Sequence, residues 1–117
     1  RLRTSRMAKL RFRDFSVDFV LGETEFDRNA QTRTRRVEYL GISMPVVSPE
    51  DLVLYKLIAH RPRDISDIEM VLRRQRSNLD LAYLRKWARW LARETGLKRI
   101  ETTLARMWKR YGRRPGS

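Results

Sequence analysis

The hydrophobic pattern of the sequence changes near residue 48, and this change constrains the fold more than any other feature. Residues 7–47 hold short apolar stretches of strand length, whereas residues 48–111 hold apolar side chains at helical spacing. Strands that come first and helices that follow are typical of an α+β fold. We therefore expect a short mixed or antiparallel sheet over about residues 7–47, followed by a helical cap over about residues 48–111.

Alternation between apolar and other side chains predicts the first strands. In residues 15–21, FSVDFVL, Phe15 and Phe19 share one face, as the two-residue period of a strand requires. Residues 8–12 alternate in the same way, so we expect a hairpin that turns at residues 13–14. The rest of this half is expected to form a short helix from Glu25 to about Arg35 and strands over residues 37–40 and 42–46, joined at Gly41.

Capping signals divide the second half into helices. Ser48 is a good N-cap, Pro49 suits the first helical position and Asp51 completes a capping box. The helix that they start is apolar on nearly every side over residues 52–59, so it should be buried. Three more helices are expected, one starting at Asp64, one from near Asp80 to just before Gly96, and one over residues 98–111.

Length and composition limit the class of protein. The 117 residues fit a single domain, and a hydrophobic content of 41% is enough for one core. No apolar run approaches the ~20 residues of a membrane span, and the absence of cysteine excludes disulfides and cysteine metal sites. These features favour a cytoplasmic protein without a membrane partner. Because the sequence starts at an arginine, we expect it to lack the N-terminal portion of its domain, and residues 112–117 should form a flexible tail.

The charge balance favours a polyanionic partner. Lysine and arginine number 27 against 14 acidic residues, so the net charge is 27 − 14 = +13. A chain this basic should attract nucleic acid. An arginine-rich proteome would explain the preference for arginine, but not the excess of cations over acids. The last two helices carry cations opposite their apolar stripes, which makes the candidate nucleic-acid contacts Arg85, Arg89, Arg93, Lys98, Arg106 and Lys109.

Asp18 is the first candidate for chemistry. It stands in the middle of a predicted strand, on the face opposite the apolar set, where strand propensity disfavours a carboxylate. One interpretation is an ordinary acid that faces solvent. The other is a ligand for Mg²⁺, which prefers carboxylate oxygens and substrate phosphates. The pattern leaves both open.

Lys56 is the second candidate, because it interrupts a helix that should be buried. Its amine either extends to the surface or faces an anion in a cleft. Asp64 has the pattern of a helix N-cap with Asp67 three positions later, although both are also candidates for a binding site. His60 has no metal-ligand spacing around it, so we interpret it as structural. The three tryptophans lie on apolar faces and are expected in the core.

These residues carry a resemblance to a known family. The segments SVDFVLGETEFDRNA, VVSPEDLVLYKLIAHRPRDISDIEMVL and LDLAYLRKW are similar to the C-terminal two-thirds of minimal nucleotidyltransferases. That group has the DNA polymerase β-type fold and includes the AbiEii-type toxins. The resemblance covers about residues 15–90, and its most specific part is the K-x4-R-x2-D-x2-D spacing of Lys56, Arg61, Asp64 and Asp67.

The resemblance implies a role for each matching residue. Asp18 would be the third carboxylate of a two-metal site that holds Mg²⁺, and Lys56 would pair with the triphosphate of an NTP, so both are candidate catalytic residues. Arg61, Asp64 and Asp67 would lie near the nucleotide. The reaction would transfer a nucleoside monophosphate from an NTP to an RNA or protein acceptor. RNA, with tRNA as one candidate, is favoured, and a cognate antitoxin would be a further partner.

One departure from the family bears on activity. Its first motif, a Gly-Gly or Gly-Ser turn followed by an Asp-x-Asp strand, is missing before Asp18. Two-metal chemistry needs several carboxylates around ions ~3.5–4 Å apart, so we expect the chain as given to be inactive, either because it is truncated or because it is degenerate. Two alternatives are a non-catalytic basic nucleic-acid-binding module and a toxin–antitoxin component that acts by protein binding.

Overall fold

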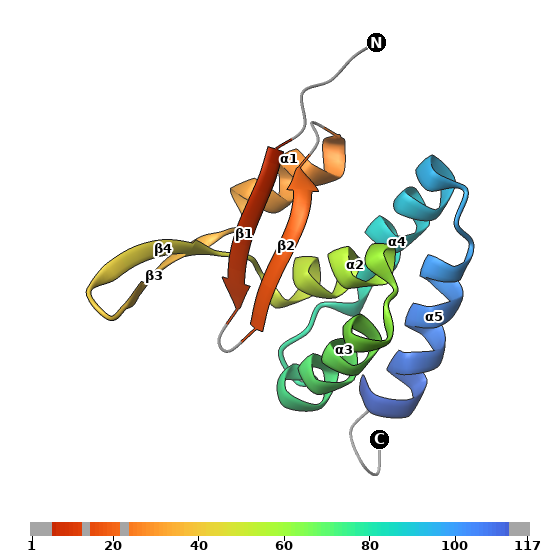
Figure 1. Ribbon diagram of the computed structural model, residues 1–117. Coiled ribbons are helices and arrows are strands. Elements are labelled where there is room, and N and C mark those ends of the chain that lie inside the picture. The colour runs from red at the N-terminus through yellow and green to blue at the C-terminus, as the bar shows by residue number, and fades with distance from the viewer. Residues whose placement is uncertain (1–5, 13–14, 22–23, 113–117) are drawn as a thin grey trace. The chain divides into compact units, whose positions relative to one another are not determined.

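The computed structural model describes the backbone of residues 6–12, 15–21 and 24–112, and the side chains of residues 24–112 (Figure 1). The chain divides into two compact units, residues 1–48 and residues 49–117. Strands dominate the first unit and helices form the second, so the predicted α+β class is confirmed. That the whole chain forms one domain stays a prediction.

The first unit begins with the predicted hairpin. Strand β1 (Arg6–Phe12) pairs with strand β2 (Phe15–Leu21) in an antiparallel register that places Phe12 opposite Phe15. The pairing confirms the expectation drawn from alternation. The turn at residues 13–14 lies outside the described residues.

A helix and a second hairpin complete this unit. Helix α1 (Glu25–Thr32) starts with a capping box, in which the Thr24 hydroxyl accepts from the backbone N–H of Asp27 at 3.1 Å. Strands β3 (Arg35–Tyr39) and β4 (Ile42–Val46) then pair antiparallel. The strand order is β2-β1-β4-β3, and β1 pairs with β4 in parallel, so the sheet is mixed.

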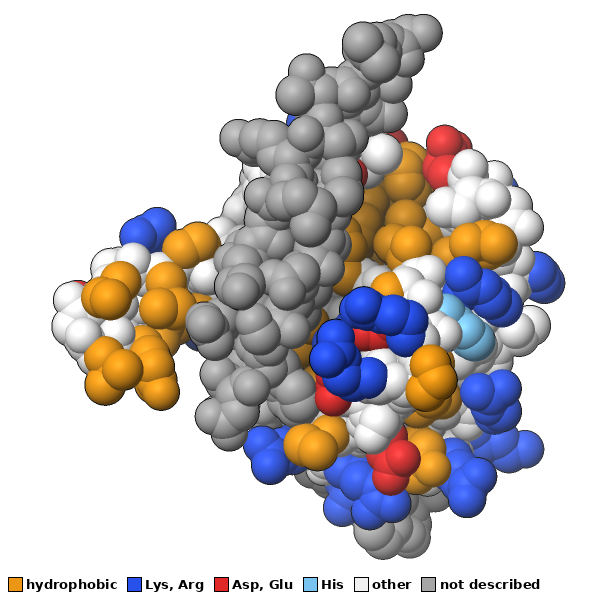
Figure 2. Space-filling view, in the orientation of Figure 1, with side chains coloured by type: hydrophobic (Ala, Val, Ile, Leu, Met, Phe, Trp, Pro, Cys, Tyr) orange, Lys and Arg blue, Asp and Glu red, His pale blue; other side chains and the backbone are white. Residues whose placement is uncertain are grey.

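The turn between β3 and β4 consists of Leu40 and Gly41, with φ of 54° and 78°. Positive φ at both central residues is what a tight hairpin turn of type I′ requires. The hairpin exposes several large apolar side chains (Figure 2), namely those of Val37, Tyr39, Leu40 and Ile42.

The second unit is helical. Its elements are α2 (Pro49–Ala59), α3 (Pro62–Gln75), α4 (Leu81–Thr95), α5 (Arg99–Met107) and the π-helical turn η1 (Trp108–Gly112). Every residue of α2 from Glu50 to Leu57 is buried, which confirms the expectation drawn from its apolar surface. Within this unit α2 contacts α3, α4 and α5, so it forms the centre of the helical core.

Buried polar contacts join the start of α2 to the start of α4. The Glu50 carboxylate accepts from the backbone N–H of Asp80 at 3.0 Å, and the Asp51 carboxylate accepts from the Tyr83 hydroxyl at 2.5 Å. Asp51 is completely buried. We had assigned it only to a local capping box, and its partner across the helix pair was not predicted.

The observed helix boundaries show which capping signals in the sequence predicted the start or end of a helix correctly. Asp80 caps α4 by accepting from the backbone N–H of Tyr83 at 3.0 Å, and Gly96 ends α4 in the left-handed region with φ of 75°. Both confirm predictions. Helix α3, however, begins at Pro62, so the predicted start at Asp64 was wrong by two residues. Proline favours the first helical position, and Asp64 is therefore the third residue of the helix.

At the C-terminal end, the structure differs from the predicted flexible tail at one residue. Gly112, which we placed in a flexible tail, is buried in η1. The remaining tail residues, 113–117, lie outside the described residues. Among the residues that are described, no helix is both long enough and apolar enough to cross a bilayer.

Candidate functional site

The sharp corner between α2 and α3 brings the family-like residues together. After Ala59 the chain turns at His60, which has a φ of 58°, and α3 starts two residues later. The Arg99 guanidinium donates to the backbone carbonyls of Leu57 and Ile58 at 3.0 and 3.2 Å. It therefore satisfies carbonyl groups that the end of a helix leaves without intrahelical partners.

Lys56 lies at this corner with its amine buried. The side chain is 5% exposed, and Nζ lies 2.9 Å from Oδ2 of Asp67 and 3.3 Å from Oδ1 of Asp64. Extension of the amine to bulk solvent, one of the two interpretations of Lys56, is therefore excluded. Within the described residues, the amine faces two carboxylates of α3, those of Asp64 and Asp67. Both belong to the K-x4-R-x2-D-x2-D motif of the sequence.

Asp64 is held more tightly than an ordinary N-cap. Its carboxylate accepts from Nε of Arg61 at 2.6 Å, from Nη2 of Arg61 at 3.2 Å and from the backbone N–H of Arg61 at 3.0 Å. Burial by itself raises the pKa of Asp64. The hydrogen bonds from the Arg61 side chain and backbone and from Lys56 outweigh this effect, and the pKa lies below its usual value of 3.8.

These four residues, Lys56, Arg61, Asp64 and Asp67, form what we call the corner cluster. Its inner half is buried, with Asp64 only 1% exposed, whereas the side chains of Arg61 and Asp67 are 56% and 22% exposed. Two cations and two carboxylates balance, which is the condition under which charges are tolerated in a protein interior. The cluster therefore fixes the α2–α3 corner and presents a guanidinium to solvent.

Asp18 lies in β2, where its backbone pairs with that of Lys9. Its side chain is outside the described residues, so a metal-binding role stays a prediction. Among the described side chains, no group of three or more acidic or histidine residues is arranged to hold a metal ion. Asp64 and Asp67 are both bonded to protein cations. The described residues thus do not fit a Mg²⁺ site. The single histidine, His60, lies 3.3 Å from the Thr103 hydroxyl, which agrees with its structural interpretation.

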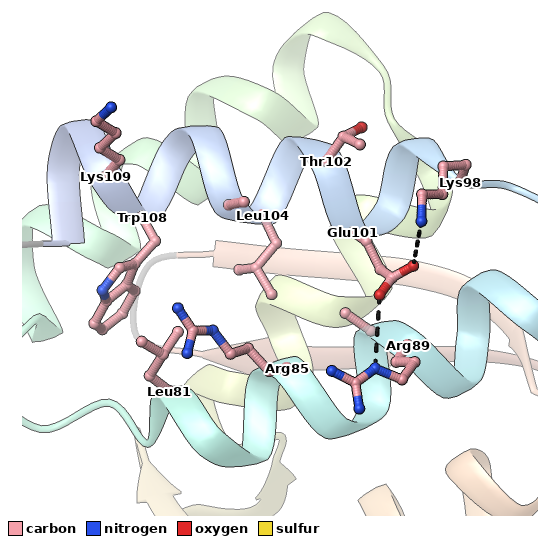
Figure 3. Close-up of a pocket in the computed structure, with 11 residues that line it drawn as sticks. Leu81, Arg85, Arg89, Lys98, Glu101, Thr102, Leu104, Trp108 and Lys109 are labelled. Atoms are coloured by element: carbon pink, nitrogen blue, oxygen red, sulfur yellow. Dashed lines mark hydrogen bonds and ion pairs between the residues drawn. The ribbon is translucent and has the colours of Figure 1, made fainter.

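The six predicted nucleic-acid contacts are all exposed. Four of them, Arg85, Arg89, Lys98 and Lys109, line one groove of about 680 Å³ between α4 and α5 (Figure 3). The other two, Arg93 and Arg106, are not among its lining residues. The structure therefore gathers most of the predicted basic residues at one concave surface, which a separate view of each helix did not predict.

Trp108 lines the same groove, and we had expected it in the core. Trp87 is buried, as expected, whereas Trp90 and Trp108 are only partly buried. Helical spacing placed Trp108 beside Leu104 and Met107. The chain changes to π-helical geometry at Trp108, whose partly buried side chain lines the groove together with Leu104. The sequence offers a weak signal for this change in the glycine that follows at position 112.

Comparison with known proteins adds one finding. No curated protein and no solved structure matches the chain. One family model does match, over residues 8–114, and its description is nucleotidyltransferase of unknown function (DUF6036). The match spans both compact units and includes Asp18, the corner cluster and the α4–α5 groove. The chain therefore belongs to this family of nucleotidyltransferases.

Proposed function

We propose that this chain binds a nucleoside triphosphate at the corner cluster, and that in the intact enzyme this site serves the transfer of a nucleoside monophosphate to RNA. Membership of a nucleotidyltransferase family supports the reaction class. The observation that carries the site is the buried ammonium of Lys56 beside the exposed guanidinium of Arg61 at one tight corner. The net charge of +13 supports RNA as the acceptor.

The corner cluster can supply positive charge to a triphosphate. An ammonium has three N–H donors, and two of those of Lys56 are directed at Asp64 and Asp67. Arg61 is more than half exposed, so its planar guanidinium is accessible to phosphate oxygens that approach from solvent. The carboxylates would hold both cations in place before the ligand arrives, which lowers the entropic cost of binding.

The reaction itself is a substitution at the α-phosphorus of the NTP. A hydroxyl oxygen of the RNA forms a bond to that phosphorus, the bond to the bridging oxygen breaks, pyrophosphate leaves, and the hydroxyl proton passes to solvent. Lys56 and Arg61 would bind and orient the triphosphate. We assign no step to Mg²⁺, because the described residues do not fit it. Asp18 remains the predicted ligand.

The test is equilibrium binding of a fluorescent ATP analogue to the chain and to two matched variants. Arg61→Gln and Arg63→Gln each remove one positive charge from an exposed position at the start of α3. We expect Arg61→Gln to weaken binding about tenfold or more, because a hydrogen bond to a charged group contributes about 1.5–3 kcal/mol. Arg63→Gln should change it less than about twofold. Equal effects of the two substitutions would refute binding at the corner cluster.

We expect the chain to bind an NTP but not to transfer a nucleotide to RNA. The sequence holds no Asp-x-Asp before Asp18, and one strand carboxylate cannot fix two ions. Incubation of the 117-residue chain with RNA and α-labelled NTPs should therefore give no incorporation above background. Robust incorporation would show that our account of the metal ligands is wrong.

A second candidate function is a basic RNA-binding module without catalysis. The groove between α4 and α5, lined by four cations, favours it. The two functions differ in their ligands, since a pure RNA binder would bind RNA and ignore the ATP analogue. No described contact bears on an antitoxin partner, which stays a prediction.

A further inference from the structure

The groove between α4 and α5 has two chemically different ends (Figure 3). At one end the Glu101 carboxylate lies 3.4 Å from Lys98 and 3.8 Å from Arg89, so one anion is shared by two cations. At the other end Arg85 and Lys109 line the groove. Within the described part of the chain neither makes a hydrogen bond, an ion pair or a ring contact. The excess positive charge is therefore concentrated at the second end.

Trp108 lies at this same end. Its indole ring projects into the groove beside Leu81, and the Arg85 side chain extends towards it (Figure 3). The groove thus presents an aromatic ring next to Arg85 of α4, whereas the Lys109 side chain of η1 extends away from the groove (Figure 3).

Gly112 fixes the position of the indole. A Cβ atom added to Gly112 would lie 2.5 and 2.6 Å from two atoms of the Trp108 ring system. Those atoms belong to the rigid fused rings, so a side chain at position 112 would displace the indole. The lack of a side chain at Gly112, at the end of the π-helical turn, therefore leaves room for the indole.

We propose that this end of the groove binds single-stranded RNA, with one base stacked on Trp108 and a flanking phosphate at Arg85. Aromatic stacking and backbone cations are the two components of single-strand recognition. A volume of about 680 Å³ lies within the usual range for a ligand site. The inference rests on the proposed function, since it names the surface that receives the RNA acceptor.

An acidic peptide fits the groove less well. A peptide helix would need a broad apolar strip to bury, whereas two of the apolar residues that line this groove, Ala88 and Ala105, have only small side chains. Trp108 adds a planar aromatic surface at one end, which is suited to a base. The cations on the α4 side are arginines, which bind phosphate through two parallel hydrogen bonds.

The experiment measures binding of a fluorescein-labelled hexauridylate to the full chain by fluorescence anisotropy at several salt concentrations. Trp108→Leu keeps an apolar side chain but removes the aromatic face, and we expect it to weaken binding at least about fivefold. Arg85→Gln should weaken binding and reduce the slope of log K against log salt by about 0.7, the value for one phosphate on a single strand. Circular dichroism melts establish that each variant is folded.

Arg74→Gln is the matched control, because Arg74 is an exposed arginine of α3 outside the groove. It should change affinity less than about twofold and leave the salt slope unaltered. Equal losses in Arg74→Gln and Arg85→Gln, or unchanged binding by a folded Trp108→Leu variant, would overturn the proposal. Competition by polyglutamate that depends on Trp108 would assign the groove to an acidic peptide instead.

The ATP analogue separates this inference from the proposed function. Trp108→Leu should bind the analogue as the unaltered chain does, and Arg61→Gln should bind the hexauridylate normally. If Trp108→Leu lost the analogue as well, the groove would be a site for free nucleotides, and the proposal of an RNA strand would be refuted. If only analogue binding failed, the proposed function would be wrong and the RNA groove would stand.

Discussion

The Nζ atom of Lys56 and the Oδ1 atom of Asp64 lie 3.3 Å apart, and both side chains are almost completely buried. The pair joins the core helix α2 to the first turn of α3, and Arg61 and Asp67 complete its charge balance at the surface. A buried charge that loses its partner is costly. The same residues that we propose for nucleotide binding therefore also stabilise the fold, and the two roles need separate measurements.

Removal of Lys56 should strongly destabilise the chain. Lys56→Met keeps the apolar stem but leaves Asp64 and Asp67 without the ammonium, and loss of one partner of a buried pair costs about 3–5 kcal/mol. Urea unfolding measures the difference. The control is Glu69→Gln, which breaks an exposed pair with Arg73 at 3.0 Å and should cost about 1 kcal/mol or less. Similar losses in both variants would show that the buried pair adds no special stability.

The stability contributed by Asp64 should depend on pH. Because its pKa in the folded chain lies below the usual value of 3.8, this contribution is fully present above that value and is lost as pH falls through the folded pKa. The difference in unfolding free energy between the unaltered chain and Asp64→Asn should therefore be largest near neutral pH and shrink in acid. Urea titrations from neutral pH down to the acid limit of folding give the curve. A difference that grows as pH falls would contradict the assignment.

The hydrogen bond between Tyr83 and Asp51 should be detectable in stability. Tyr83→Phe removes the hydroxyl that donates to a completely buried carboxylate at 2.5 Å, and hydrogen bonds to charged groups contribute about 1.5–3 kcal/mol. Tyr39→Phe is the matched control, because Tyr39 is 60% exposed, and it should leave the unfolding free energy unchanged. Equal stabilities of the two variants would argue against this contact.

Gly112→Ala should destabilise the chain through Trp108. The added methyl group would clash with the indole ring, and overpacking of this kind costs about 1–3 kcal/mol. The cost should be much smaller in a Trp108→Leu background, so a double-mutant cycle should show coupling between the two positions. Thermal or urea unfolding of the four proteins gives the coupling energy. Additive effects would place the origin of the cost outside this contact.

Local signals predicted much of the fold. The alternation of β2, the start of α4 near Asp80 and its end before Gly96 each depend on a few consecutive residues, and each was confirmed. The start of α3 was misplaced because Asp64 has the composition of an N-cap, whereas the proline at position 62 was the stronger signal.

Contacts between helices were harder to predict. The sequence motif indicated that Lys56 and Asp64 belong together, but it did not show that the lysine would be paired with protein carboxylates. The α4–α5 groove depends on how two helices pack, and a periodicity of 3.6 residues does not reveal the π-helical turn that begins at Trp108. The residues that line the groove, which come from two helices, therefore had no signature in any single segment.

Backbone amide chemical shifts of the ¹⁵N-labelled chain, measured during titration with ATP, test the central claim most directly. Our account predicts that the largest shift changes fall on residues 56–67, at the corner between α2 and α3, and that Arg61→Gln reduces them while Arg63→Gln does not. Shift changes confined to residues 81–109 around the groove, or no changes at saturating ATP, would contradict a nucleotide site at the corner cluster.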